Sequence, residues 1–570
     1  MVAISRRPHS VQRHEAGRSA ADRNSVARSG SVFGRFPMDR VSWRTNSEPK
    51  RATDCSKEAG GSLIVCSIRS VGDDYLEHTM RRFRIRTLHL VARLAFIVAG
   101  VVLCAPALAD VKPASIFGPS MVLQRDMPVS VFGTADAGEE VAVTFGGQTK
   151  KATADSAGRW KIQLDPLAAS DQGQTLKIAG KNTIELADVL VGEVWICSGQ
   201  SNMEWPLAAS VNAEQEVAAA QHPRIRLFNV PDHLTSPVPK DTCPGTWQTC
   251  TPETAKGFSA VGYFFGRRLE KDLNVPVGLV GSNWGGTRIE PWVSLSGFRK
   301  IAELAPIAEQ VAAYTESTKV EPTSPSAIHH AMIYPLGPFA MRGAIWYQGE
   351  SNGNEGESYH HKKQALVAGW REQFNPNLGF YWVQLANFQK PNDDPAGGDG
   401  WARLREAQVQ SLGIPHTGMA VIIDIGEAND IHPRNKQDVG WRLAQWALHQ
   451  TYGKKELVPS GPLYASHKAE GGSIRVAFHH VGGGLMVGAK TGLEPTTEVA
   501  NGKLERFAIA GADKKWVWAD AKIDGETVVV SSPSVPEPVA VRYAFSMNPV
   551  GANLYNKDGM PASPFRTDNW

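Results

Sequence analysis

The chain has 570 residues, of which 42% are hydrophobic and 21% are charged, values typical of a soluble globular protein with two or three domains. Residues 1–109 carry 18 Lys and Arg against 9 Asp and Glu, whereas residues 110–570 carry 42 against 48. This mildly acidic main part argues against the clustered basic face that a nucleic-acid-binding protein needs, so we expect no nucleic-acid partner.

The segment 80–109 has the three parts of a secretory signal peptide. A basic head (Met80–Arg86) is followed by an apolar run (Leu94–Leu103) and by Ala107–Ala109, an A-x-A cleavage site before Asp110. The apolar run is too short to span a membrane comfortably, so a transmembrane anchor is the weaker alternative. The sequence therefore predicts export to the periplasm or the extracellular space, with no membrane contact after cleavage.

Residues 1–79 precede this signal, although signal peptides stand at the true N-terminus of a protein. The segment is rich in Arg and Ser and has little hydrophobic periodicity, which is typical of disorder. Translation from a start codon upstream of the real one produces the same appearance. We favour this second interpretation, in which Met80 is the true start.

Two regions contain short apolar runs separated by glycine-rich turns, a pattern typical of β-domains. Residues 110–190 contain the runs Val129–Phe132 and Val141–Phe145, and residues 456–570 contain the run Gly472–Phe478. We therefore expect an N-terminal β-domain over the first region. We expect a second β-domain, like a sandwich or a jelly roll, over the last region.

Residues 191–455 alternate between strand-like and helical patterns, which favours an α/β domain with a parallel sheet. The runs expected to form strands are Val189–Cys197, Val277–Gly281, Gly343–Trp346, Phe380–Leu385 and Met419–Ile423. The stretches expected to form helices are Tyr263–Leu273, Tyr359–Phe374 and Gln437–His449. A helical and then proline-rich stretch near 298–330 interrupts the alternation, and we expect it to be an insertion or a lid.

The main part of the chain contains three cysteines. In an exported protein we expect Cys243 and Cys250 to form a disulfide across the loop between them. Cys197 follows an apolar strand and is expected to be a buried, inert thiol. The sequence has no C-x-x-C pair and no H-E-x-x-H motif, so it predicts no metal site.

Four polar motifs follow expected strands, and the first is Gly199–Met203, with the sequence G-Q-S-N-M. Ligands bind at the carboxyl ends of the strands in α/β folds, and backbone N–H groups at a helix start stabilise oxyanions. Ser201 is therefore a candidate nucleophile; the alternative is that it only caps the following helix. Ser201 lies in G-Q-S-N-M and not in a G-x-S-x-G motif, which argues against the nucleophile elbow of the α/β-hydrolases at this serine.

The second and third motifs supply candidate oxyanion donors. The second, Gly281–Trp292, contains Gly285 and Gly286, which allow the backbone to approach a ligand closely. The third, Ala344–Asn352, contains Gln348, whose side-chain amide can donate to an oxyanion, and Glu350, an acid that can orient its neighbours. Each of these residues taken alone also fits an ordinary polar turn.

The fourth motif, Asp424–Lys436, follows an apolar run and precedes a helix whose first turn suits Pro433. His432 would then lie at the same edge of the sheet as the serine. A serine nucleophile needs such a base, and the base needs an acid that fixes its tautomer. Asp430 and Asp424 are the carboxylates close to His432 in the sequence.

Together, the motifs G-Q-S-N-M, G-G-T-x-I-E-x-W, W-Y-Q-G-E-S and N-D-I-H-P-x-N-K-Q resemble the sialate O-acetylesterase family, a branch of the SGNH hydrolases. The resemblance covers the whole chain after the predicted signal peptide. It implies a flavodoxin-like three-layer α/β domain joined to β-rich segments, and hydrolysis of O-acetyl esters on carbohydrates without a cofactor. It also implies Ser201 as nucleophile, His432 as general base, and oxyanion donors from Ser201, from Gly285 or Gly286, and from Gln348.

The resemblance leaves the acid of the triad open. SGNH enzymes generally place an Asp three residues before the His, and Asn429 occupies that position here. Asp430 lies two residues before His432, and Asp424 lies eight before it. We favour Asp430 as the acid, with Asp424 as the alternative.

Several functional alternatives remain at this point. The family's namesake substrate is O-acetylated sialic acid, whereas exported bacterial relatives suggest a plant polysaccharide such as xylan or xyloglucan. A non-catalytic carbohydrate-binding protein would be expected to lack the Ser–His pair, and a surface adhesion protein would be expected to carry repeats or an anchor. The sequence predicts nothing about the oligomeric state.

Overall fold

The computed structural model describes residues 110–570. The predicted signal peptide and the segment before it lie outside the described residues.

Seven short strands form the N-terminal region: β1 (Lys112–Pro113), β2 (Val122–Gln124), β3 (Val129–Thr134), β4 (Glu140–Phe145), β5 (Gln148–Thr153), β6 (Arg159–Leu164) and β7 (Ser170–Ala179). In β6 the side chains of Trp160, Ile162 and Leu164 are buried and the residues between them are exposed, which is the alternation of a half-buried strand. Strands β1, β3 and β6 form one sheet, whereas β4, β5 and β7 connect to the central sheet.

Strand β8 (Thr183–Gly199) joins this region to the central sheet. Its first part pairs antiparallel with β7, and its second part pairs in parallel with β11 (Val277–Asn283) and β12 (Gly343–Tyr347). Residues 189–199 are all buried. The domain boundary expected between residues 190 and 191 therefore falls inside one continuous strand, because the apolar run that forms it does not stop there.

The central sheet has the strand order β10-β9-β11-β8-β12-β13-β14. Its remaining strands are β9 (His222–Asn229), β10 (Trp247–Cys250), β13 (Gly379–Val383) and β14 (Thr417–Ala420). All neighbours are parallel except β10, which is antiparallel to β9 at one edge. All five runs that the sequence predicts as strands contribute to this sheet, so the expectation of an α/β domain flanked by separate β-sheets is confirmed.

Strands β9 and β10 were not predicted. Strand β9 carries Arg224 and Arg226 among its apolar residues, which hides the strand pattern. Arg226 is nevertheless buried, because its guanidinium donates to the Asp188 carboxylate at 2.5 Å and to the Pro223 carbonyl at 3.0 Å. A charged residue is accepted in a covered strand when such partners satisfy it.

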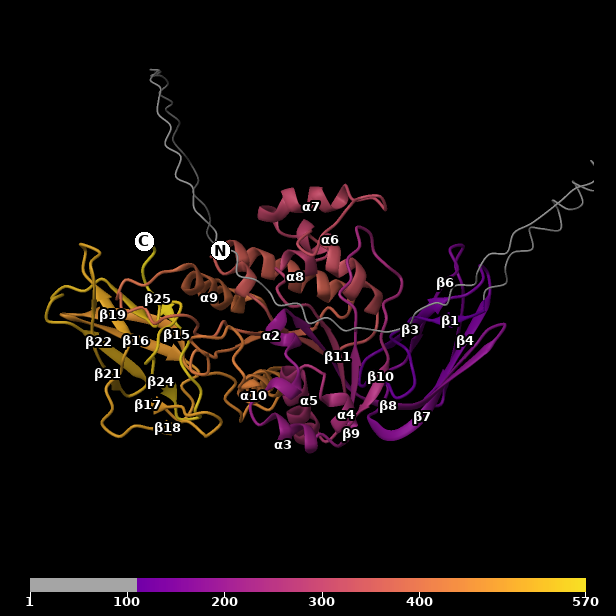
Figure 1. Cartoon of the computed structure of the whole chain (residues 1–570), viewed down its shortest axis with the longest axis horizontal. Coiled ribbons are helices and arrows are strands. Elements are labelled where there is room, and N and C mark those ends of the chain that lie inside the picture. The colour runs from indigo at the N-terminus through magenta and orange to yellow at the C-terminus, as the bar shows by residue number, and fades with distance from the viewer. Residues whose placement is uncertain (1–109) are drawn as a thin grey trace, which may run out of the picture. The chain divides into compact units, whose positions relative to one another are not determined.

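The α-helices of residues 110–570 are α2 (Ser201–Glu204), α3 (Ala213–Ala218), α4 (Pro252–Ala255), α5 (Ala260–Leu273), α6 (Leu295–Arg299), α7 (Ala305–Ala312), α8 (Ser358–Gln373), α9 (Gly400–Gln410) and α10 (Lys436–Trp446). Helices α5 and α10 pack against each other, and α8 packs against α6 and α9 (Figure 1). The stretch near 298–330 contains α7 and the end of α6; its role as an insertion or lid stays a prediction.

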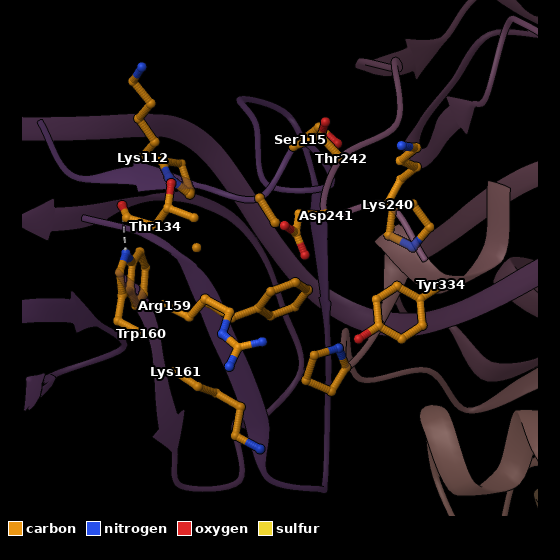
Figure 2. A pocket seen from close by; sticks show the side chains of 17 residues that line it. Lys112, Ser115, Thr134, Arg159, Trp160, Lys161, Lys240, Asp241, Thr242 and Tyr334 are labelled. Carbon is orange, nitrogen blue, oxygen red and sulfur yellow. Dashed lines mark hydrogen bonds between the residues drawn. The ribbon is translucent and has the colours of Figure 1, made fainter. Parts of the chain in front are cut away.

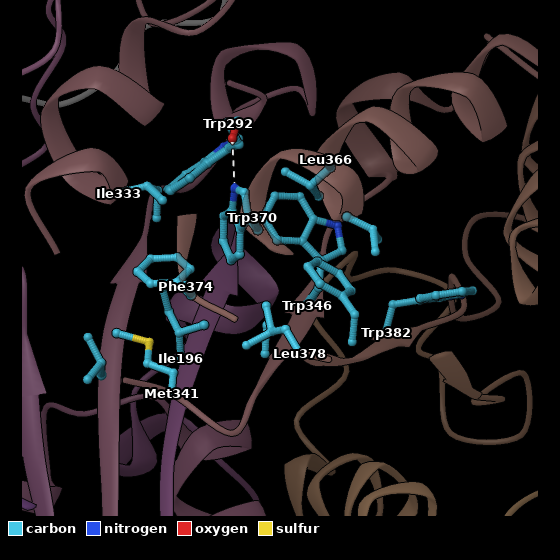
Figure 3. Close-up of a cluster of buried hydrophobic side chains, with 14 of the residues drawn as sticks. Ile196, Trp292, Ile333, Met341, Trp346, Leu366, Trp370, Phe374, Leu378 and Trp382 are labelled. Carbon is cyan, nitrogen blue, oxygen red and sulfur yellow. Dashed lines mark hydrogen bonds between the residues drawn. The ribbon is translucent and has the colours of Figure 1, made fainter. Parts of the chain in front are cut away.

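Alternating side chains of the central strands bury both faces of the sheet. Trp195 and Tyr381 belong to the core that includes the apolar residues of α5 and α10, whereas Trp346 belongs to the core on the side of α8. There the Trp346 and Trp370 rings meet edge to face at 5.9 Å, and Trp370 donates its indole N–H to the Trp292 carbonyl (Figure 3). Each such ring pair contributes about 0.5–1.5 kcal/mol beyond the burial of its area.

The C-terminal region contains the strands β15 (Leu463–Glu470), β16 (Ser473–His479), β17 (Leu485–Ala489), β18 (Thr497–Glu498), β19 (Phe507–Ala510), β20 (Trp516–Trp518), β21 (Asp520–Asp524), β22 (Thr527–Ser531), β23 (Ala540–Tyr543), β24 (Leu554–Asn556) and β25 (Phe565–Arg566). Arg405 of α9 ties this region to the α/β part. Its buried guanidinium donates to the carbonyls of Ser546 and Met547 in the C-terminal region and to those of Leu385 and Ala386 after β13.

The prediction of a disulfide between Cys243 and Cys250 is wrong, because all three cysteines of the described residues are free and buried. The Cys243 thiol faces the Ser115 hydroxyl of the N-terminal region, and the Cys250 thiol contacts the Ala220 carbonyl at 3.6 Å. Burial raises the pKa of Cys243 to about 11 and that of Cys250 to about 12. The spacing in the sequence did not reveal that the two side chains point toward different neighbours.

Within residues 110–570, no helix is both long enough and apolar enough to span a membrane.

Candidate active site

Ser201 is the first residue of α2, two residues after the end of β8. Gly199 ends the strand with a φ of +141°, and a Cβ there would lie 2.2 Å from the Tyr347 carbonyl, so the tight turn requires glycine. Gln200 occupies the N-cap position of the helix. The alternative that Ser201 only caps the helix is therefore wrong, since its side chain is free for another partner.

That partner is His432, in the loop between β14 and α10. The His432 Nε2 atom lies 2.9 Å from Ser201 Oγ, and the Nδ1 atom lies 3.1 Å from Asp430 Oδ1. With the proton on Nδ1, the ring donates to Asp430 and its Nε2 atom accepts the serine proton. Trp205 stacks on the imidazole at 4.9 Å between ring centroids, with 19° between the planes, and helps to hold its orientation.

The two candidate acids have different partners. Asp430 accepts from both the backbone N–H and the ring of His432, and its side chain is 45% exposed. Asp424 is buried and forms a bidentate ion pair with Arg442 at 2.6 and 2.8 Å. The alternative assignment of Asp424 is therefore wrong in this structure. Asn429, at the usual spacing, is exposed.

Gly285, one of the expected oxyanion donors, lies close to Ser201. A Cβ built on Gly285 would be 3.2 Å from Ser201 Cβ and 3.1 Å from Glu204 Oε2. The Gly285 N–H donates to Glu204 at 2.6 Å, and the other oxygen of Glu204 lies 2.8 Å from His233 Nε2. Gly286 has a φ of +75°, which favours glycine. In this structure the Glu204 carboxylate thus accepts the hydrogen bond from the Gly285 N–H, which the sequence predicts to bind an oxyanion.

Gln348 is fully buried and already fully hydrogen-bonded. Its amide nitrogen donates to the Thr287 carbonyl at 3.1 Å and to Asn352 Oδ1 at 2.7 Å, while its amide oxygen accepts from the Tyr359 hydroxyl at 2.9 Å. The amide therefore braces the second and third motifs against each other. Its role as an oxyanion donor stays a prediction, and it requires one of these hydrogen bonds to be released.

The comparisons with known proteins cover the part of the chain that contains these motifs. The family model described as "Carbohydrate esterase, sialic acid-specific acetylesterase" matches residues 191–449. Sialate O-acetylesterases from Homo sapiens and Pongo abelii are each 33% identical to the chain, over 61% of this chain and 73% of theirs. The crystal structure of a carbohydrate acetylesterase from Xanthomonas citri is 39% identical, with a TM-score of 0.71, and the match covers 81% of this chain and 100% of that one.

The chain belongs to the sialate O-acetylesterase family of carbohydrate esterases. The resemblance read from the four motifs is confirmed, and so is the prediction of a carboxylic ester hydrolase. The alternatives of a non-catalytic binding protein and of an adhesion protein are not supported.

A cavity of about 230 Å³ lies at the end of the third motif. It is lined by Glu350 and Ser351 of the third motif, and also by Trp401 of α9 and by Met547 of the C-terminal region. Arg288 also lines it, but its guanidinium is engaged by the carboxylates of Glu290 and Glu355. The α/β part and the C-terminal region thus both contribute to the lining of this cavity.

A separate cavity of about 360 Å³ lies between the N-terminal region and the segment around Lys240 and Tyr334 (Figure 2). Its lining includes four basic side chains: Lys112, Arg159, Lys161 and Lys240. Trp160 at its wall donates to the Thr134 carbonyl at 3.0 Å. None of the 17 lining residues belongs to the four motifs, so this cavity is not part of the Ser201 site.

Several residues of the site escaped sequence reasoning. Asn202, Glu204 and Trp205 directly follow the nucleophile, and their proximity along α2 was the available signal. Lys436 was inside the fourth motif, but its partner is 234 residues away in the chain. His233 had no signal, because it lies in a loop that no motif marks.

Proposed function

We propose that this acetylesterase is an exported enzyme that uses Ser201, His432 and Asp430 to remove O-acetyl groups from a carbohydrate. The single observation that carries the roles is the continuous arrangement of these side chains. Ser201 Oγ, His432 Nε2, His432 Nδ1 and Asp430 Oδ1 are joined by contacts of 2.9 and 3.1 Å.

The reaction is a double displacement. His432 Nε2 takes the proton of Ser201 while Oγ attacks the acetyl carbonyl carbon, and the carbonyl oxygen becomes an oxyanion. The C–O bond to the sugar then breaks, and the sugar oxygen leaves with the proton from His432. Water, deprotonated by His432, attacks the acetyl-enzyme and releases acetate. Asp430 stabilises the imidazolium in both steps, and the sequence predicts that no cofactor takes part.

The oxyanion would be bound by backbone N–H groups of Ser201 and of Gly285 or Gly286, with Gln348 as a further donor. This role requires Glu204 to leave the Gly285 N–H when substrate binds, because the two acceptors compete for one donor. The competition predicts a change of the Glu204 side chain between the free and the substrate-bound enzyme.

The order of the central strands supports a flavodoxin-like architecture. When the edge strands β9 and β10 are left out and β8, β11, β12, β13 and β14 are counted as strands 1 to 5, their order in the sheet is 2-1-3-4-5, the flavodoxin-like order. We propose an SGNH three-layer domain over 191–455 with β-domains over 110–190 and 456–570. Export remains a proposal that rests on the signal-like segment 80–109; N-terminal sequencing of secreted material should find Asp110 first.

The substrate is either an acetylated sialic acid, as the names of the curated relatives suggest, or a neutral plant polysaccharide such as xylan or xyloglucan. One observation favours the neutral sugar. A sialic acid carries a carboxylate that a free cation would recognise, but Arg288, the basic residue that lines the cavity at the end of the third motif, is already engaged by Glu290 and Glu355.

A panel of acetylated glycans, assayed for acetate release, tests the proposal. Wild-type enzyme should release acetate from at least one of acetylated sialic acid, xylan and xyloglucan, and Ser201→Ala should release none above background. Higher kcat/KM on sialic acid than on both polysaccharides would overturn the preference for a neutral sugar. Failure on every acetylated carbohydrate would overturn the proposed function.

A further inference from the structure

The Asn202 side chain lies between two buried charged groups. Its amide nitrogen donates to Glu350 Oε1 at 2.6 Å, and its amide oxygen accepts from Lys436 Nζ at 2.5 Å. The other oxygen of Glu350 is buried with no hydrogen-bond partner among the described residues, and Lys436 is fully buried. Buried polar atoms are nearly always paired, so an unpaired oxygen on a carboxylate that contacts Asn202, the residue after Ser201, requires an explanation.

The same amide connects the two catalytic loops. Asn202 follows Ser201 in α2, and its nitrogen also donates at 3.0 Å to the carbonyl of Ile431, the residue before His432. Both N–H groups and the oxygen of this amide are therefore engaged. The amide cannot flip, because flipping would turn its N–H groups toward the Lys436 ammonium and its oxygen toward the Glu350 carboxylate.

Lys436 also contacts Trp205, the aromatic residue that stacks on His432. Its ammonium lies 5.7 Å from the centre of the Trp205 ring, the ring that stacks on His432, and 5.2 Å from the Tyr347 ring. Glu350, Asp430 and Glu427 are the acids that face it. Burial lowers the pKa of Lys436 to about 7 and raises the pKa of Glu350, so both charges are held at a cost.

We infer that Glu350 and Lys436 are positioning residues of this acetylesterase, which act through Asn202 to hold Ser201 and His432 at hydrogen-bond distance. The inference rests on the proposed roles of Ser201 and His432. Two buried opposite charges joined through an amide are a poor source of stability, because desolvation of the charges offsets their attraction. They do fix geometry, since each charge accepts one orientation of the amide between them.

Glu350→Gln and Lys436→Met, alone and combined, test this inference with three readouts: kcat and KM on an acetylated substrate, the rate at which a phosphonylating reagent labels Ser201, and the melting temperature. Each single variant should lower kcat and the labelling rate by at least about tenfold, because small displacements of reacting groups are costly, and should leave KM within about threefold. The double variant should lose no more than the worse single variant, because the two charges act as one unit.

Lys363→Met is the matched control. Lys363, in α8, is also a fully buried lysine, and its ammonium lies over the rings of Trp346, Tyr359 and Trp382. This variant should keep kcat and the labelling rate within about twofold, whatever it does to the melting temperature.

Three outcomes separate the possibilities. Single variants with wild-type kcat and only a lower melting temperature would show a structural role and overturn the inference, as would losses that multiply in the double variant. Glu350→Gln preserves the shape of the side chain, so its kcat and labelling rate decide the question if Lys436→Met does not fold. A wild-type enzyme that is inactive on every acetylated sugar, yet is labelled at Ser201, would instead contradict the proposed function and leave the labelling comparison valid.

Discussion

The proton-transfer side and the oxyanion side of the active site differ in the hydrogen bonds that they already make. On the proton-transfer side, His432 lies at hydrogen-bond distance from both Ser201 and Asp430. On the oxyanion side, the Gly285 N–H already donates to Glu204. In the proposed mechanism, activation of the nucleophile therefore needs no rearrangement, whereas binding of the oxyanion at the Gly285 N–H requires Glu204 to release its hydrogen bond.

The largest expected effect comes from a substitution on the proton-transfer side. Ser201→Ala should lower acetate release by at least about ten-thousandfold, because the nucleophile, base and acid act as a unit. The melting temperature should stay close to that of the wild type, since a half-buried hydroxyl is removed. Assays of the purified variant check this, and near-wild-type turnover would show that another residue is the nucleophile.

The acid gives the next largest effect. Asp430→Asn should lower kcat by about a thousandfold, somewhat less than the loss seen where the acid is fully buried, because water screens the half-exposed carboxylate.

Asp424→Asn is its matched comparison. This variant should keep kcat but lower the free energy of unfolding by about 3–5 kcal/mol, because it weakens the partner of the buried Arg442. Chemical denaturation and kcat measured on the same samples check both variants. The opposite pattern, with Asp424→Asn inactive and Asp430→Asn active, would reverse the assignment.

Gln348→Ala probes the oxyanion half. If Gln348 donates to the oxyanion when substrate binds, kcat should fall by about a hundredfold or more, as for other oxyanion donors. A residue that only braces Thr287 and Asn352 would instead change the melting temperature and leave kcat within about threefold. Kinetics with a small acetyl ester distinguish the two roles, because such a substrate makes few contacts besides those of its acetyl group.

Glu204→Ala should have the smallest effect and the opposite sign. Removing the carboxylate frees the Gly285 N–H, so kcat/KM for a small acetyl ester should rise by about two- to fivefold, the effect of one modest hydrogen bond that no longer has to be broken. Glu214→Ala, an exposed acid on α3, is the control and should change nothing. A steep loss in the Glu204 variant would show that this carboxylate helps catalysis.

Much of the catalytic layout could be predicted from the sequence. Ser201, Gly285 and Gln348 each follow an apolar run that becomes a strand of one parallel sheet, and the carboxyl ends of parallel strands meet at one edge. The type and order of these strands are local properties, because an apolar run between polar turns indicates a buried strand. Strand β9 was missed for the same local reason, since Arg226 interrupts its apolar pattern and finds its partner, Asp188, in another strand.

The sequence by itself determined which residue types are present at the ends of the strands, and so it indicated an esterase with a Ser–His pair. Only the tertiary structure decided which partner each charged or polar side chain takes. Asp424 pairs with Arg442, Cys243 faces Ser115, and Asn202 joins Lys436 to Glu350. These contacts join residues up to 234 positions apart, and their choice depends on distances of a few ångströms and on burial, which no local pattern encodes.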